Sequence, residues 1–150
     1  MALNAGRIGH TYPATSYEVG REKIREFADA IGDPNDAFRE PVHAQSLGHP
    51  DVIAPPTFPV VITRASQIVA FSDPRLGVDF TRLVHGEQRF AYTRPIVAGD
   101  VLSCTATVEA IKSVAGNDIM TMRHDITDAA GEPVVTAWAT VVIRAPEDAA

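Results

Sequence analysis

Two segments of the chain carry the hydrophobic spacing of a helix. In the first, GREKIREFADAIGD (residues 20–33), apolar side chains recur at intervals of three and four residues, at Ile24, Phe27, Ala28 and Ile31. This spacing gathers them on one face of a helix, and Gly32 then supplies a C-terminal stop. The second segment, Thr57–Phe71, is apolar around most of its circumference, which predicts a helix buried on nearly every side.

The second half of the chain alternates apolar and polar residues with a period of two, as strands do. Residues 101–111 (VLSCTATVEAI) and 119–127 (IMTMRHDIT) both show this alternation, and the first places on one face Leu102, Cys104, Ala106, Val108 and Ala110. Residues 86–95 and the β-branched residues 134–145 predict two more strands, with tight turns between the later segments. Together with a short edge strand near residues 17–19, these segments predict an antiparallel sheet.

The order of these elements predicts one fold class. A sheet must bury one apolar face, and only the helix Thr57–Phe71 is apolar enough to cover it. The prediction is therefore an α+β protein with a single hot-dog fold, in which an antiparallel sheet wraps around a central helix. A chain of 150 residues suits one domain, residues 1–150, with a sizeable core. We expect the last residues, PEDAA, to fray.

Charge and composition exclude several classes of function. The formal net charge of −6 argues against general nucleic-acid binding, which relies on Lys and Arg to neutralise phosphates. Arg82, Arg89 and Arg94 could form a local basic patch, although we favour a solvated sheet face. No apolar run approaches the roughly 20 residues that span a bilayer, and the N-terminus lacks a signal peptide's pattern, so we expect a cytoplasmic protein without membrane contact. One cysteine, Cys104, excludes an intramolecular disulfide, and the histidines lack metal-binding spacing, so no metal or cofactor is expected.

The candidate chemistry lies in a long irregular loop predicted from Gly32 to Pro56, because such loops in compact domains are usually functional. The loop begins with GDPNDAF, which nearly spells the acyl-hydratase motif Gly-Asp-x-Asn-Pro-x-His. Asp33 supplies the acid of this motif, whereas Phe38 stands where the motif has its basic histidine. The loop ends in VIAPPTF, where the second helix is predicted to begin.

These two segments, together with FAYTRPIVAGD, GNDIMTMRHDIT and the order of elements, resemble the MaoC-like dehydratases over about residues 8–145. More narrowly, YEVGREKIREFA and RPIVAGD resemble an actinobacterial group of short single-hot-dog proteins with a MaoC N-terminal-type domain. That group includes the substrate-binding subunit of the mycobacterial (3R)-hydroxyacyl-ACP dehydratase, a heterodimer. Members of the family reversibly remove water from a (3R)-3-hydroxyacyl thioester.

The resemblance implies a catalytic loop in which an Asp and a His share one water and move both protons. Asp33 matches the catalytic Asp, and Asn35 matches the loop-shaping Asn that follows it. Phe38 matches the His and cannot move protons, so the general base is missing. Losing one positioned acid–base group typically lowers the rate by about 10²–10⁴.

The resemblance also implies a backbone N–H donor at the start of the central helix, which stabilises the enolate formed on the thioester oxygen. Active members have Ile-Ala-His-Gly there, but this chain has Ile53, Ala54, Pro55 and Pro56. Proline has no N–H, so the expected donor is missing unless a shifted loop presents the amide of Thr57. Losing such a donor lowers the rate by about 10²–10³. We therefore expect negligible activity from the chain alone.

In this family the acyl chain lies in a tunnel along the central helix. The resemblance implies that the space between this helix and the strand near Gly86 is open and apolar. Phe38 would then form an apolar wall where the catalytic water once lay. The expected substrate-binding residues are Phe38, Pro55, Pro56, Thr57, Phe58, Ile62 and Phe90.

Three functions remain open at this point. The leading hypothesis is a subunit that binds an acyl thioester of CoA or acyl carrier protein, forms a homodimer alone, and pairs with a catalytic hot-dog chain. The second is a self-sufficient homodimeric enoyl-CoA hydratase with a relocated base, such as His43 or His49. The third is a non-enzymatic acyl-CoA or lipid-binding protein. We interpret His85 and His124 as packing or capping residues and Cys104 as a small buried hydrophobe.

Overall fold

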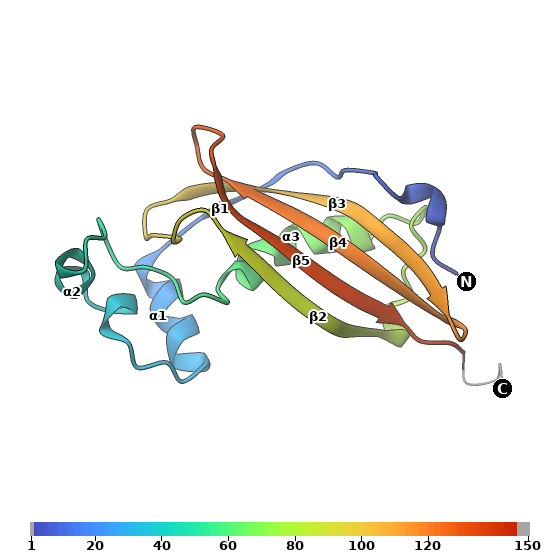
Figure 1. Ribbon diagram of the computed structural model, residues 1–150, viewed down its shortest axis with the longest axis horizontal. Coiled ribbons are helices and arrows are strands. Elements are labelled where there is room, and N and C mark those ends of the chain that lie inside the picture. Colours follow the sequence, from blue (N-terminus) through green and yellow to red (C-terminus); the bar gives the residue numbers. More distant parts are fainter. Residues whose placement is uncertain (1, 147–150) are drawn as a thin grey trace.

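The computed structural model describes residues 2–146, so most of the PEDAA segment lies outside the described residues. Figure 1 shows a long sheet with one helix behind it and a group of short helices beyond one end. In chain order the elements are η1 (Ala5–Arg7), β1 (Thr15–Glu18), α1 (Arg21–Ala30), η2 (Asp36–Phe38), α2 (Pro41–Ser46), α3 (Pro59–Phe71), η3 (Phe80–Arg82), β2 (Leu83–Tyr92), β3 (Val101–Val114), β4 (Asn117–Thr127) and β5 (Pro133–Ile143).

The five strands form one antiparallel sheet in the order β1-β3-β4-β5-β2. The sheet lies across α3, which runs behind β4 and β5 in Figure 1. This arrangement is the hot-dog fold that the sequence predicts. Because β2 is the last strand in this order, one flank of its backbone is unpaired within residues 2–146.

The inner face of the sheet forms the core, and β3 shows how it is built. Alternate residues from Leu102 to Val108 are at most 1% exposed, as predicted. Ala110 was predicted to share this face, and that prediction was wrong. The register shifts between Val108 and Ala110, so Ala110 pairs with Thr121 and Ile111 packs against the core instead. A bulge of one residue moves every later side chain to the other face of the sheet.

The end of α1 confirms the predicted stop at Gly32. Gly32 has a φ of +70°, a left-handed conformation that favours glycine. Its N–H donates to the carbonyl of Asp29 at 3.1 Å, and the N–H of Asp33 donates to the carbonyl of Ala28 at 2.9 Å. These two bonds form a Schellman motif, which ends the helix and turns the chain into the GDPNDAF segment.

The central helix differs from its prediction in two respects. It begins at Pro59, two residues later than predicted, with proline in the first turn, where no N–H donor is needed. It is also not buried on every side, because Val60, Ile68 and Val69 are 37%, 53% and 39% exposed. The sheet covers only one side of α3 within the described chain, so the prediction of an enclosed helix was wrong.

The segment from Gly32 to Pro56 is less irregular than predicted, because it contains η2 and α2. Together with α1 it forms a helical lobe, residues 21–56, beyond one end of the sheet (Figure 1). Backbone hydrogen bonds tie the lobe to the segment that follows β2: the N–H of Ala54 donates to Ile96, and the N–H of Ala98 donates to Val52. The lobe and the end of β2 therefore face each other.

Candidate functional site

A cavity of about 490 Å³ lies between the helical lobe and the end of β2. It brings together three parts of the chain that are far apart in sequence: the GDPNDAF segment, the proline pair before α3 and the residues that follow β2. Most of its surface is apolar. The lining residues are Asn35, Phe38, Ile53, Ala54, Pro56, Tyr92, Thr93, Arg94 and Pro95.

Two hydrogen bonds shape the GDPNDAF segment. Asp33 Oδ1 accepts from the N–H of Asn35 at 3.1 Å, and Asn35 Oδ1 accepts from the N–H of Ala37 at 3.0 Å. The second bond caps η2, whose last residue is Phe38. Phe38 is 5% exposed and packs into the core while also lining the cavity. Asn35 and Phe38 thus reach the cavity, whereas Asp33 does not line it and its carboxylate stabilises the turn.

The proline pair leaves a single free donor at the start of α3. The N–H of Phe58 donates to the carbonyl of Pro55 at 2.9 Å, and the N–H of Val60 donates to the carbonyl of Thr57 at 3.3 Å. Pro56, like the other prolines here, has no N–H. The N–H of Thr57 has no hydrogen-bond partner among residues 2–146, and Thr57 is exposed. Thr57 therefore offers the available backbone donor beside the cavity.

Tyr92 anchors the segment that carries the proline pair, and the sequence analysis did not single out this residue. Its hydroxyl donates to the carbonyl of Pro56 at 2.7 Å, and its ring lines the cavity. Burial raises the pKa of Tyr92 far above its usual range, so the hydroxyl remains a donor. The one feature of the sequence that could have indicated this role is a tyrosine, with its hydroxyl group, at the end of a predicted strand.

The guanidinium of Arg94 is neutralised within the protein. It donates to both carboxylate oxygens of Asp100, at 2.8 and 3.1 Å, and lies 3.6 Å from Asp128. Hydrogen bonding to Asp100 is the largest cause that raises the pKa of Arg94. Arg94 therefore lines the cavity as part of a bidentate ion pair and not as a free cation.

The basic patch considered for three arginines is not formed. Arg82 donates to Asp79 at 2.8 Å. Arg89 lies over the ring of Trp138, 3.9 Å from its centroid. With Arg94 engaged at the cavity, each arginine has its own partner, and the three do not gather into one anion-binding surface.

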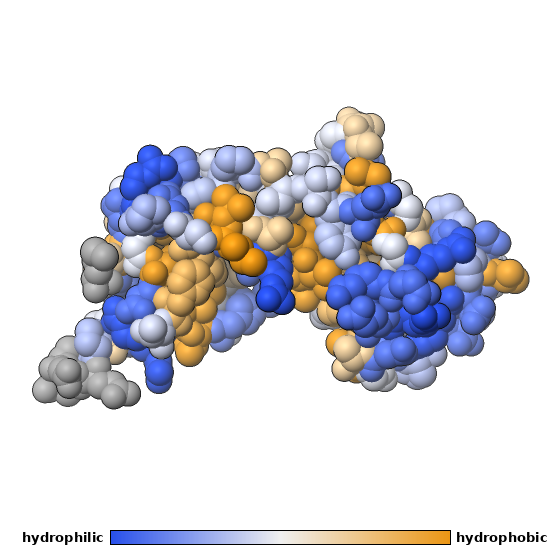
Figure 2. Space-filling view, turned by 180° about the vertical axis from the view of Figure 1, so that it is seen from behind, coloured by the Kyte–Doolittle hydropathy of each residue, from blue (hydrophilic) through white to orange (hydrophobic). Residues whose placement is uncertain are grey.

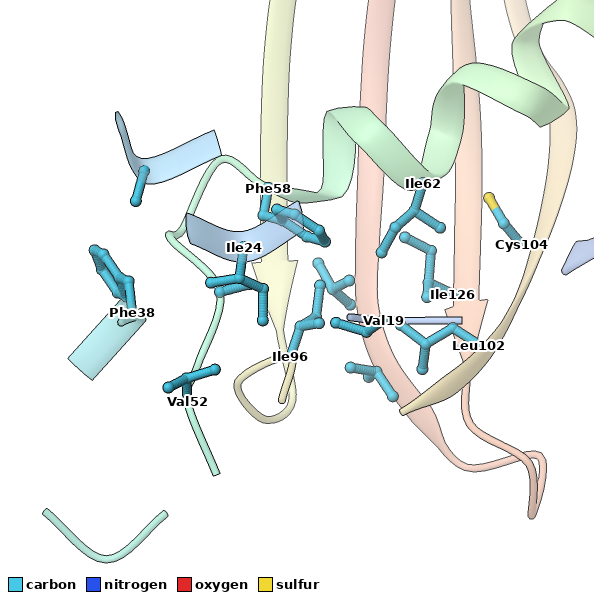
Figure 3. Close-up of a cluster of buried hydrophobic side chains, with 14 of the residues drawn as sticks. Val19, Ile24, Phe38, Val52, Phe58, Ile62, Ile96, Leu102, Cys104 and Ile126 are labelled. Carbon is cyan, nitrogen blue, oxygen red and sulfur yellow. The ribbon is translucent and has the colours of Figure 1, made fainter. Parts of the chain in front are cut away.

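Phe58 and Ile62, expected to line an acyl tunnel, lie in the core. Phe58 is 0% exposed and Ile62 is 1% exposed. Figure 3 shows both side chains turned into the cluster between α3 and the sheet. Phe58 packs edge-on against Phe27, with ring centroids 5.5 Å apart. Phe90 is half-buried against the same cluster. The cavity lies outside this cluster, next to Phe38 and Pro56.

The histidines proposed as a relocated base, His43 and His49, are not among the residues that line the cavity. His43 is exposed on α2. His49 is half-buried and lines an adjoining hollow, which shares Arg94 and Pro95 with the cavity. His85 lies on β2 with its Nε2 atom 3.2 Å from Gln88 Oε1.

His124 is fully buried under α3, where it packs as the sequence suggested. Its Nδ1 atom lies 3.0 Å from Ser66 Oγ, and Cys104 Sγ lies 3.3 Å from the same oxygen. Nε2 of His124 has no hydrogen-bond partner within the described residues. Burial lowers the pKa of His124 to about 4 and raises the pKa of Cys104 to about 11. Both side chains are therefore neutral at pH 7.

The polar lining of the cavity consists of four side chains. They belong to Asn35, Thr93, Arg94 and Tyr92, and none of these groups exchanges a proton readily near neutral pH. Among residues 2–146, no group of three or more His, Cys, Asp or Glu side chains is placed to hold a metal ion. In the same part of the chain, no helix is both long and apolar enough to cross a membrane.

The fold is that of a hot-dog protein, and the comparisons with known proteins assign it to the hydratase and dehydratase class. A family model described as FAS1-like, dehydratase domain region, matches residues 7–137. The chain belongs to this family, that of the MaoC-like dehydratases. A UPF0336 protein of Streptomyces coelicolor is 56% identical over 150 residues, which cover 99% of this chain and 100% of that protein.

Two solved structures extend the comparison. The truncated HadBC complex of Mycobacterium tuberculosis, a (3R)-hydroxyacyl-ACP dehydratase, matches with a TM-score of 0.82 and 31% identity, over 91% of this chain and 96% of that chain. A MaoC-like dehydratase matches with a TM-score of 0.86 and 36% identity, over 95% of this chain and 43% of that chain. These likenesses confirm the family resemblance and the hot-dog fold inferred from the sequence.

Proposed function

We propose that this chain is the acyl-thioester-binding subunit of a (3R)-3-hydroxyacyl-thioester dehydratase and that a partner hot-dog chain supplies the catalytic Asp and His. The cavity beside Phe38 and Pro56 carries this proposal. It lies between the GDPNDAF segment and the start of α3, the two segments in which the family resemblance implies catalytic groups. Apolar side chains stand where a base and an N–H donor are expected, and such a surface suits the hydrocarbon part of an acyl group.

The polar groups around the cavity suit the thioester end of the ligand. Thr57 is exposed and directly follows Pro56, which lines the cavity, so the backbone N–H of Thr57 can donate to a carbonyl oxygen of the ligand. The side chains of Asn35 and Thr93 add hydrogen-bonding groups to the wall. All of these groups bind and orient, so proton transfer falls to the partner.

A partner has a large surface on which to dock, which we call the α3–β2 face. Figure 2 shows the side on which α3 lies, with hydrophobic residues gathered across the middle between more hydrophilic ends. Tyr92, which is 40% exposed, belongs both to this face and to the cavity, so a docked partner would close the cavity. The face comprises Val60, Arg64, Ala65, Ile68 and Val69 of α3 with Leu83, His85, Gln88, Phe90 and Tyr92 of β2.

The relatives support a partner unit for this chain. The similar mycobacterial structure is a complex, and the similar MaoC-like dehydratase continues well beyond the matched 43% of its chain. The unpaired flank of β2 offers backbone hydrogen bonds to a partner strand. In the absence of a catalytic partner, a second copy of this chain would occupy the same face as a homodimer.

Calorimetry with acyl-CoA and a crotonyl-CoA hydration assay, both on the purified chain, test the proposal. We expect longer acyl chains to bind more tightly than acetyl-CoA, because each buried methylene contributes about 0.8 kcal/mol. We expect negligible hydration. Thr93→Trp should block binding by filling the cavity from its rim, whereas Thr136→Trp, on the outer sheet face, should not.

Three outcomes would contradict the proposal. Turnover in the ordinary range of roughly 1–10³ per second would mean that the chain has its own base, and His43→Ala would be the first variant to examine. Equal affinity for acetyl-CoA and longer acyl-CoA, or no binding of any acyl-CoA, would contradict the acyl-binding role. Binding without activity in the presence of a catalytic hot-dog chain would instead indicate a non-enzymatic lipid-binding protein.

A further inference from the structure

Arg64 lies in the middle of the exposed side of α3. It is four residues from Val60 and four from Ile68, so the three side chains share one face of the helix. Val60 and Ile68 are 37% and 53% exposed, and Arg64 is also exposed. The Arg64 side chain makes no ion pair or hydrogen bond with residues 2–146. The α3–β2 face thus carries an unpaired positive charge on an otherwise apolar helix surface.

The remainder of this face contains no carboxylate. α3 has neither Asp nor Glu in its sequence. The β2 side chains on the α3 side of the sheet are those paired with buried residues of β5, namely Leu83, His85, Gln88, Phe90 and Tyr92. The one acid of β2, Glu87, pairs with the half-buried Thr140 and lies on the outer face.

The acids between the two elements are already engaged. Asp73 follows α3 and accepts hydrogen bonds from Arg7 and Tyr12, at 2.7 and 3.1 Å. Asp79 precedes η3 and accepts from Arg82 at 2.8 Å. Neither carboxylate is free to pair with an arginine of a second chain.

A contact between two copies of this chain through one face is isologous, so each copy presents the same surface to the other. Self-pairing through the α3–β2 face would bury Arg64 against a surface that offers no carboxylate. The homodimer would therefore be weaker than a pairing that supplies one, because an unpaired buried charge is destabilising. We infer that this face selects a non-identical chain, one that presents an apolar surface with a carboxylate opposite Arg64. The inference rests on the proposed role of this chain as one subunit of a heterodimer.

Sedimentation equilibrium on variants of residue 64 tests this selection. We expect Arg64→Met to self-associate roughly tenfold more tightly than the wild type, because a neutral side chain of similar length can be buried without a partner. Arg64→Lys keeps the charge and should behave like the wild type. Lys112→Met removes an exposed cation from the outer face of the sheet, where Lys112 is the strand-register partner of Ile119. This variant should self-associate as the wild type does.

Mixing two forms of the chain supplies the missing carboxylate. An equimolar mixture of wild type and Arg64→Glu should associate roughly tenfold more tightly than the wild type alone, and the gain should shrink with added salt. A mixture no tighter than the wild type, or an Arg64→Met chain no tighter than the wild type, would overturn the inference and leave a second copy as the occupant. Absence of association in every sample would also overturn it. No thioester is present in these measurements, so failure of the acyl-binding role would not alter their result.

Discussion

Tyr92 shows how one side chain can hold a loop that lacks its own donors. Pro55 and Pro56 have no N–H, so their corner can be anchored only through carbonyl groups and packing. The hydroxyl of Tyr92 supplies an anchor by donating to the carbonyl of Pro56 at 2.7 Å. The family motif predicts nothing about this residue, because the contact joins positions 36 residues apart.

We expect Tyr92→Phe to lower the free energy of unfolding by about 1 kcal/mol, the usual contribution of one hydrogen bond, and to weaken thioester binding. Urea denaturation and calorimetry would measure the two effects. Tyr17→Phe is the matched control, because the Tyr17 ring packs against Phe58 and its hydroxyl makes no hydrogen bond within the described residues. Equal losses in the two variants would show that the bond to Pro56 is unimportant.

At the scale of elements, α1 and its termination follow from local sequence, whereas the environment of α3 does not. The apolar spacing of α1 and the glycine after it act within a few residues of the chain. The sequence of α3 is apolar on nearly every side, but the exposure of Val60 and Ile68 depends on which surfaces the remainder of the chain brings to it. The sequence of this helix alone therefore does not specify how many of its sides are covered.

Gly32→Ala should lower the free energy of unfolding by about 1 kcal/mol, because a side chain is strained in the left-handed conformation. Gly32 has a φ of +70°, and an added Cβ would meet no atom within 4 Å, so the loss would come from the backbone alone. Gly20→Ala is the control, since Gly20 has an equally open environment and a φ of −104°. Thermal unfolding of both variants would measure the difference, and similar midpoints would contradict the role of the Schellman turn.

At the scale of the whole molecule, one polar cluster links three elements across the core. Ser66 of α3 contacts both His124 of β4 and Cys104 of β3. His124 is 0% exposed, and burial lowers its pKa from 6.5 to about 4. The folded protein therefore holds this imidazole neutral under conditions in which the unfolded chain binds a proton.

This difference predicts how stability depends on pH. As the pH falls from 6.5 to about 4, the unfolded state gains a proton that the folded state does not, so the free energy of unfolding should fall by about 3 kcal/mol. Below that range both states are protonated and the His124 contribution stays constant. Denaturation at several pH values would show the slope. His124→Gln should remove it, whereas His43→Gln, at an exposed position, should retain it.

Two carboxylates with lowered pKa values, Asp73 and Asp79, predict a further loss of stability at lower pH. The pKa values of Asp73 and Asp79 are lowered from 3.8 to about 2. Hydrogen bonds from Arg75 and Tyr12 favour the ionised form of Asp73. Hydrogen bonds from Thr81 and Arg82 do the same for Asp79. Their stabilisation is present above pH 3.8 and is lost only as the pH falls towards 2. A slope confined to this lower range would contradict the assignment to His124.

The sequence by itself determined those properties that depend on neighbours in the chain or on covalent structure. The period-two alternation of the second half and the spacing of α1 predicted the sheet and the helix. Phe38 has no titratable group and Pro56 has no N–H, whatever the fold around them. The hot-dog class followed from the order of these elements, and the expectation of an inactive isolated chain combines such local facts with what the family resemblance implies for these positions.

Only the tertiary structure decided which residues meet. The bulge in β3 moved Ala110 off the core face, and packing between α3 and the sheet placed Phe58 and Ile62 in the core. The folded loop turned the carboxylate of Asp33 to its own backbone, and the sheet left one side of α3 uncovered. Each of these outcomes depends on space that distant segments fill jointly, and hydrophobic spacing along one segment does not specify which side chains of distant segments it will contact.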